Sequence, residues 1–191
     1  MQEKLAHAFS LEEARIIGLR KDQVYRLLAE GKVERIGRGI FMRSGSIDPA
    51  LISLTAATIA QPQATLCLTS ALVYHNLVDT IPTGSDIALP RGVRFPAGVS
   101  HAIWHSFDKD TFDLGRVALQ NDFGLKLNIY SPERCIVDMF RLAHREGHDV
   151  AITAIKRWLA SPGSSAGKLL ELAHSFPKAK PTLRRTLEVL L

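Results

Sequence analysis

Short helical and strand-like patterns follow one another at the start of the chain. A helix is expected over residues 3–9. Ser10 and Glu13 then have the spacing of a capping box, in which the hydroxyl accepts a bond from the N–H three residues on and the carboxylate reaches back to the serine N–H. The helix that starts there is expected to end at Gly18, because glycine readily adopts the left-handed conformation that follows many helices.

A second helix is predicted over residues 21–30. Val24, Leu27 and Leu28 fall at positions i, i+3 and i+4 and form an apolar stripe, and Gly31 ends the pattern. Two helices joined by a tight glycine turn form the helix-turn-helix pattern.

The segment over residues 33–43 has the pattern of a β-hairpin. Val33 and Ile36 flank charged residues, residues 37–39 (Gly-Arg-Gly) supply a turn, and residues 40–42 are strand-like. We interpret this hairpin as a wing with an arginine at its tip.

After a linker at residues 44–46, the chain mixes helices and strands. The helices are predicted over residues 48–60, from Thr69 or Ser70 to residue 75, over residues 131–146 and over most of the chain after residue 150. Breaks in the last helical region are expected at residues 161–163, at Pro177 and at Pro181. The strands are predicted over residues 86–90, 99–107, 116–120 and 126–130. The expected fold class is α+β, with a winged helix-turn-helix over residues 1–46 and a mixed α/β domain over residues 47–191.

The composition favours a folded protein with an anionic partner. Of the 191 residues, 46% are hydrophobic, which is enough to bury a core. The net charge of +5 favours nucleic acid first and a membrane surface second. Residues 20–43 carry seven basic side chains against three acidic ones, an excess that can neutralise phosphates.

The remaining composition indicates a soluble, cytoplasmic protein with no membrane association. The most apolar segment, residues 51–60, is too short to span a bilayer, and the N-terminus lacks the pattern of a signal peptide. Cys67 and Cys135 lie in apolar surroundings and are expected to be buried thiols in a reducing compartment.

The run SLEEARIIGLRKDQVYRLLAEGKVERIGRGIFMR resembles the N-terminal winged helix-turn-helix of the AbiEi family, the antitoxins of type IV toxin–antitoxin systems. Gly31, Arg38, Gly39 and Phe41 fall on the family's pattern. The runs DPALISLTAATIA, TSALVYHNL, SDIALPRG and SPERCIVDMFRLA resemble successive segments of the family's longer domain. One departure is that the second helix begins without a serine or threonine cap.

This resemblance implies a transcriptional autorepressor and antitoxin rather than an enzyme. The winged domain would bind repeats in its own promoter, and the C-terminal domain would counter a toxin, commonly a nucleotidyltransferase-like protein encoded next door. The expected partners are double-stranded DNA and such a toxin, with direct contact between the two proteins left open. No cofactor and no metal are expected, and the oligomeric state is left open.

The side chains predicted to contact DNA come from the second helix and the hairpin. Residues at the start of the second helix of a helix-turn-helix enter the major groove, where glutamine can pair with adenine and arginine with guanine. Arginines of a wing meet phosphates or a minor groove. The predicted contacts are Arg20, Lys21, Gln23, Tyr25 and Arg26 from the helix and Arg35, Arg38 and Arg43 from the hairpin.

A metal-dependent nuclease guided by the same winged module is the alternative from another class. Asp86 and Asp122 are its acidic candidates, but Lys126 has no acidic residue two positions before it, as such a site would need. His101 and His105 would lie about 13 Å apart along a strand, too far for one metal ion. No catalytic residue is therefore assigned.

A third interpretation is a protein-interaction module whose basic face docks on a toxin. Arg91 and Arg94 form one further basic patch, and residues 178–185 form another. Asp138 follows Arg134 by four residues in an apolar helix, so the two are expected to form an ion pair.

Overall fold

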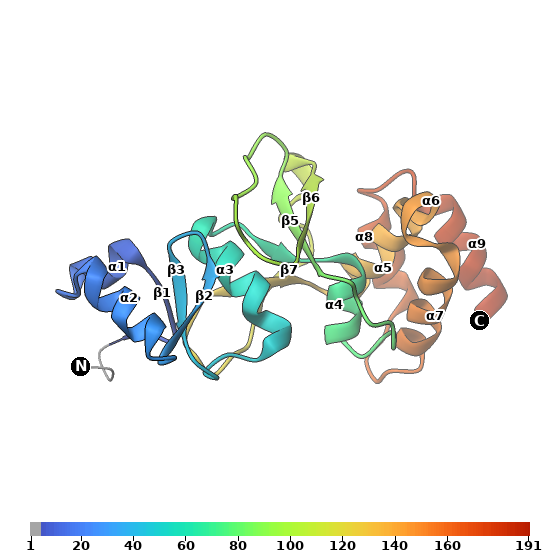
Figure 1. Ribbon diagram of the computed structural model, residues 1–191. Helices are drawn as coiled ribbons and strands as arrows, with labels where there is room; N and C mark the ends of the chain where they lie inside the picture. The colour runs from blue at the N-terminus through green and yellow to red at the C-terminus, as the bar shows by residue number, and fades with distance from the viewer. Residues whose placement is uncertain (1–4) are drawn as a thin grey trace.

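A computed structural model describes residues 5–191 and has the mixed α and β architecture expected from the sequence (Figure 1). The chain begins with helices packed on a three-stranded sheet, continues into a five-stranded sheet and ends in a group of helices at the far end of the molecule. Within residues 5–191, none of the helices has the length and apolar character needed to cross a membrane.

The first sheet forms from the N-terminal segment and the predicted hairpin. It comprises β1 (Ala8–Ser10), β2 (Val33–Gly37) and β3 (Ile40–Arg43) in the order β1-β3-β2, with α1 (Leu11–Ile16) and α2 (Lys21–Ala29) as its helices. The predicted helix over residues 3–9 is wrong over its described part, because residues 5–7 form no helix and Ala8 and Phe9 pair with β3 and bury opposite faces. Residues 3 and 4 lie outside the described residues.

The predicted capping box and glycine turn are confirmed. The Glu13 N–H donates to Ser10 Oγ at 3.1 Å, and the Ser10 N–H donates to the Glu13 carboxylate at 2.6 Å. Gly18 has a φ of +86°, a left-handed conformation that costs glycine little. These local bonds set the start of α1 and the direction of the chain into α2.

The predicted linker at residues 44–46 is a hydrogen-bonded turn. The Ser44 hydroxyl donates to the Gly31 carbonyl at 2.8 Å, and the Ser44 N–H donates to the Lys32 carbonyl at 3.1 Å. The Ser46 hydroxyl donates to the Arg43 carbonyl at 2.8 Å. Each bond ties the turn back to the first sheet or to the segment just before it.

The first sheet is buried on both faces. On one face, Phe41 stacks with Phe9 at 6.0 Å between ring centroids and packs against α1 and α2. On the other face, Ile40 and Met42 join the core of residues 47–191. The two predicted domains therefore share this sheet, and their cores are separated by its thickness alone.

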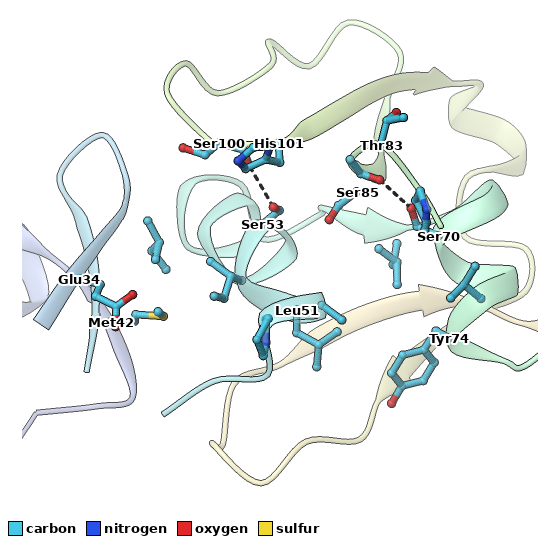
Figure 2. A pocket seen from close by; sticks show the side chains of 18 of the residues that line it. Glu34, Met42, Leu51, Ser53, Ser70, Tyr74, Thr83, Ser85, Ser100 and His101 are labelled. Carbon is cyan, nitrogen blue, oxygen red and sulfur yellow. Dashed lines mark hydrogen bonds between the residues drawn. The ribbon is translucent and has the colours of Figure 1, made fainter. Parts of the chain in front are cut away.

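A cavity of about 560 Å³ opens on the second face of the hairpin (Figure 2). Glu34 and Met42 line it from the hairpin, and Leu51, Tyr74 and His101 line it from the following domain. The cavity thus lies between the two parts of the chain.

The second sheet is mixed parallel and antiparallel. Its strands are β4 (Thr65–Leu66), β5 (Ser85–Pro90), β6 (Ala102–Phe107), β7 (Arg116–Leu119) and β8 (Leu127–Tyr130), in the order β6-β5-β4-β8-β7. The helix α3 (Ile52–Ala60) follows a 3₁₀ turn (Pro49–Leu51) and contacts both sheets. The two-residue strand β4 was not predicted, although it lies at the centre of the sheet.

The helix α4 (Leu68–Tyr74) begins earlier than expected. Cys67 is its N-cap, and neither Thr69 nor Ser70 caps it. The Ser70 hydroxyl instead donates to the buried Asp86 carboxylate at 2.9 Å. Ser70, which was a predicted cap of this helix, therefore links α4 to β5 through a hydrogen bond.

The C-terminal helices surround the buried helix α5. The elements are α5 (Pro132–Arg141), α6 (Ala143–Glu146), α7 (His148–Leu159), α8 (Ala166–Ala173) and α9 (Lys180–Leu190). The break predicted at residues 161–163 is confirmed, whereas the break predicted at Pro181 is wrong. Pro181 lies in the first turn of α9, where its fixed φ suits a helix and its missing N–H has no partner to lose.

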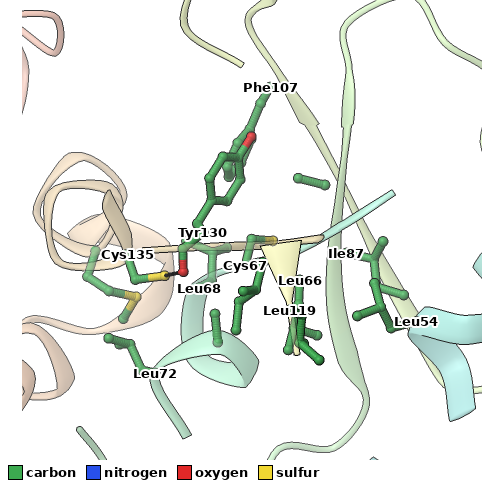
Figure 3. Close-up of a cluster of buried hydrophobic side chains, with 14 of the residues drawn as sticks. Leu54, Leu66, Cys67, Leu68, Leu72, Ile87, Phe107, Leu119, Tyr130 and Cys135 are labelled. Atoms are coloured by element: carbon green, nitrogen blue, oxygen red, sulfur yellow. Dashed lines mark hydrogen bonds between the residues drawn. The ribbon is translucent and has the colours of Figure 1, made fainter. Parts of the chain in front are cut away.

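The main core contains both cysteines (Figure 3). Cys67 and Cys135 are free and fully buried, and the Cys135 thiol lies 3.5 Å from the Tyr130 carbonyl. Burial raises the pKa of both thiols well above the ordinary value. The prediction of buried thiols is confirmed.

A buried ion pair links α5 to the surrounding elements. Arg134 is fully buried, and its Nε donates to the Asp138 carboxylate at 2.9 Å, which confirms the predicted pair. The Arg134 guanidinium also lies 4.4 Å from the Tyr130 ring centroid and 4.5 Å from that of Phe176. Arg141 donates to the second oxygen of Asp138 at 2.8 Å.

We predict that Asp138→Asn lowers the free energy of unfolding by about 3–5 kcal/mol, because it leaves the buried Arg134 charge without its counter-ion. Urea denaturation followed by circular dichroism measures this loss. Asp113→Asn is the control, since Asp113 is 83% exposed in its ion pair with Arg116 and is expected to cost less than about 1 kcal/mol. Equal losses for the two variants would contradict the prediction.

Candidate nucleic-acid interface

At the start of α2, a glutamine side chain caps the helix in place of a serine or threonine hydroxyl. Arg20 is the N-cap, and its backbone N–H donates to Gln23 Oε1 at 2.8 Å. The Arg20 guanidinium pairs with the Asp22 carboxylate at 3.1 Å on the surface. The predicted pairing of Gln23 with adenine would have to share the oxygen that caps the helix.

Three of the predicted side chains lie on one side of the first sheet, around the buried Phe41. The Tyr25 ring meets the Phe41 ring edge-on at 5.9 Å, and Lys21 Nζ lies 5.8 Å from the Tyr25 centroid. Arg35 stands directly opposite Phe41 in the register of β2 and β3, so the two share a face of the sheet. We call Lys21, Tyr25 and Arg35 the Phe41 cluster.

The hairpin tip, residues Gly37–Gly39, is hydrogen-bonded to Arg35 and to the start of α1. Arg35 Nε donates to the Gly37 carbonyl at 3.2 Å, so this side chain is directed along β2 toward the tip. The Gly39 carbonyl accepts from the Leu11 N–H at 2.9 Å, which ties the tip to the start of α1. Arg38 is exposed at the tip, as the sequence predicted.

Arg26 and Arg43 are not part of the Phe41 cluster. Arg26 follows Lys21 by five positions, so the two side chains diverge by about 140° around the helix. Arg43 is at the base of the hairpin, paired with Val33, and its Nη2 lies 3.0 Å from His7 Nε2. Arg43 therefore belongs to the hairpin as predicted, but it is half-buried at the end opposite the tip.

The acidic residues considered for a nuclease are not brought together. Asp86 is buried, with its carboxylate 2.9 Å from His105 Nε2 and bonded to Ser70. Asp122 follows β7, which lies three strand spacings, about 14 Å, from β5. Among residues 5–191, no group of three potential metal ligands is found.

The two histidines considered for a metal site, His101 and His105, have different environments. His105 is buried on β6 against Asp86, whereas His101 is exposed and precedes the strand with a φ of +56°. The predicted strand over residues 99–107 therefore starts three residues late, at Ala102. Asp86, Ser70 and His105 join α4, β5 and β6, which is a structural role that the sequence did not indicate.

The chain is similar in fold to a solved structure at low sequence identity. No protein-family model and no curated protein matches it. The crystal structure of the RV2827C protein from Mycobacterium tuberculosis is 17% identical, with a TM-score of 0.65 over 99% of this chain and 72% of that chain. At this identity the similarity establishes the mixed α/β fold alone.

We predict that Gln23→Ala lowers the free energy of unfolding by about 0.5–1.5 kcal/mol, because the Arg20 N–H loses its partner. Gln23→Glu retains an oxygen at the same position and adds a negative charge at the helix N-terminus, so it should keep the stability of the natural chain. Urea denaturation of the three proteins tests this. A loss of the same size in Gln23→Glu would show that the cap does not stabilise α2.

Proposed function

We propose that this chain is a non-enzymatic transcriptional repressor that binds double-stranded DNA through a winged helix-turn-helix. The proposal rests on one observation: Phe41 packs α2 against the hairpin, so that Lys21 and Tyr25 from the helix and Arg35 from the strand lie on one face of the first sheet. Arg38 is exposed at the tip of the same hairpin. In a helix-turn-helix with a wing, the second helix and the hairpin contact the duplex side by side.

The individual side chains suit different parts of the duplex. Lys21 is in the first turn of α2 and would enter the major groove or meet a phosphate at its edge. The Tyr25 hydroxyl, on a side chain that is 40% exposed, can donate to a phosphate oxygen. Arg38 at the hairpin tip can reach the adjacent minor groove or its phosphates.

The regulatory role comes from the resemblance to the AbiEi family. Gly31, Arg38, Gly39 and Phe41 match the pattern of that family's winged domain, and the resemblance supports an autorepressor that binds repeats in its own promoter in the cytoplasm. By the same resemblance, residues 47–191 would counter a nucleotidyltransferase-like toxin. Antitoxin activity is therefore proposed for the second domain and DNA binding for the first.

We predict that the protein binds its own promoter with an affinity that falls as the salt concentration rises. Binding releases cations from the DNA, and this release is most favourable at low salt. The double variant Arg35→Glu, Arg38→Glu should bind at least about tenfold more weakly. Fluorescence anisotropy with a labelled promoter duplex at several salt concentrations measures both effects.

Arg184→Glu, Arg185→Glu is the matched control, because it makes the same change in net charge on α9, at the other end of the molecule. The control should bind DNA within about twofold of the natural protein once nonspecific electrostatics are screened by salt. Absence of binding by the natural protein, or equal losses in both double variants, would refute the proposed interface.

We further predict that Arg35→Glu, Arg38→Glu still neutralises the toxin encoded beside this gene. The substitutions are on the first sheet, whereas antitoxicity is assigned to residues 47–191. Growth of cells that express the toxin with each antitoxin variant provides the measurement, with protein levels checked by immunoblot. Loss of both activities in a folded, expressed variant would show that DNA binding and toxin neutralisation do not belong to separate domains.

A further inference from the structure

A loop of the second domain lies against the hairpin tip. Gly98, in the connection between β5 and β6, has a φ of +77°, and a Cβ atom added to it would lie 3.1 Å from the Arg38 Cβ. Glycine therefore permits both the backbone conformation and the close approach of this loop to the tip. Two segments far apart in the sequence meet at this point.

Arg38 and Arg94 line one shallow pocket formed by this contact. The pocket measures about 340 Å³, and Gln61 and Phe95 also line it. The Phe95 ring stacks on Trp104 of β6 at 5.4 Å between centroids, with the ring planes 12° apart. This stacking holds the loop on the sheet and supports the position of Arg94.

The charges in this pocket are unbalanced. Within residues 5–191, neither Arg38 nor Arg94 forms an ion pair or a side-chain hydrogen bond, whereas Arg91 of the same loop pairs with Asp108 at 3.2 Å. Ala60 and Gln61, at the carboxyl end of α3, line the same pocket. The donor groups of two guanidiniums thus remain available to an anion, and phosphate accepts such bonds well.

We propose that Arg94 and Arg38 together bind a backbone phosphate of duplex DNA, so that the second domain extends the contact made by the wing. This inference rests on the proposed function. Phosphate contacts carry no sequence information, but they set the orientation of a protein on the duplex. The loop beside the hairpin tip therefore takes part in DNA binding, and residues 5–46 form only part of the interface.

The test compares Arg94→Ala with Arg91→Ala, two variants with the same charge change in the same loop. Arg94→Ala should weaken binding about five- to tenfold near 0.1 M salt and reduce the slope of log K against log salt by about 1. The loss should be the same for the promoter duplex and for a scrambled duplex of equal length, as expected of a phosphate contact. Arg91→Ala should change neither quantity, because Asp108 already neutralises Arg91.

The outcomes separate this inference from the proposed function. If the natural protein does not bind DNA, the proposed function fails. If the natural protein binds and Arg94→Ala matches it in affinity and salt slope, the inference alone fails. Equal losses in Arg94→Ala and Arg91→Ala would overturn it as well, since they would report general charge rather than a phosphate site. A loss confined to the promoter sequence would assign Arg94 to a base and not to a phosphate.

Discussion

Burial of the β2–β3 hairpin on both faces is the constraint on which the rest of the structure depends. Phe41 points toward α1 and α2, while Ile40 and Met42 on either side of it point into the core of the second domain. Each face needs its own apolar partner, because an exposed strand face of this composition would be unstable in water. The hairpin therefore cannot move as an independent arm. The packing of one face restricts any shift of the other face.

The candidate interface follows from this packing. The buried Phe41 ring at the centre of β3 contacts the edge of the Tyr25 ring and lies opposite Arg35 across the strand pair. The charged groups stay at the surface while the apolar group beneath them sets their spacing. Such an arrangement presents cations in a preorganised geometry, which reduces the entropy lost when they meet a charged partner.

The features predicted best from the sequence are those that depend on residues close together along the chain. The Ser10–Glu13 cap, the turn at Gly18 and the pair formed by Arg134 and Asp138 involve spacings of three or four residues, and all are present. The strand β4 has only two residues and carries no periodicity to detect. The neighbours of Arg38 in the second domain come from long-range contacts that no local pattern encodes.

If the first domain binds DNA as proposed, the hydrogen-bonded turn at residues 44–46 and the contact between Gly98 and the hairpin tip restrict how two copies could bind one duplex. A reader domain on a loose tether would accept operator repeats at many separations. A reader domain joined firmly to the body of the protein presents one angle, so two copies on one duplex would depend on the helical phase between their repeats. Inserting half a turn of DNA between the repeats would move one copy to the opposite side of the duplex.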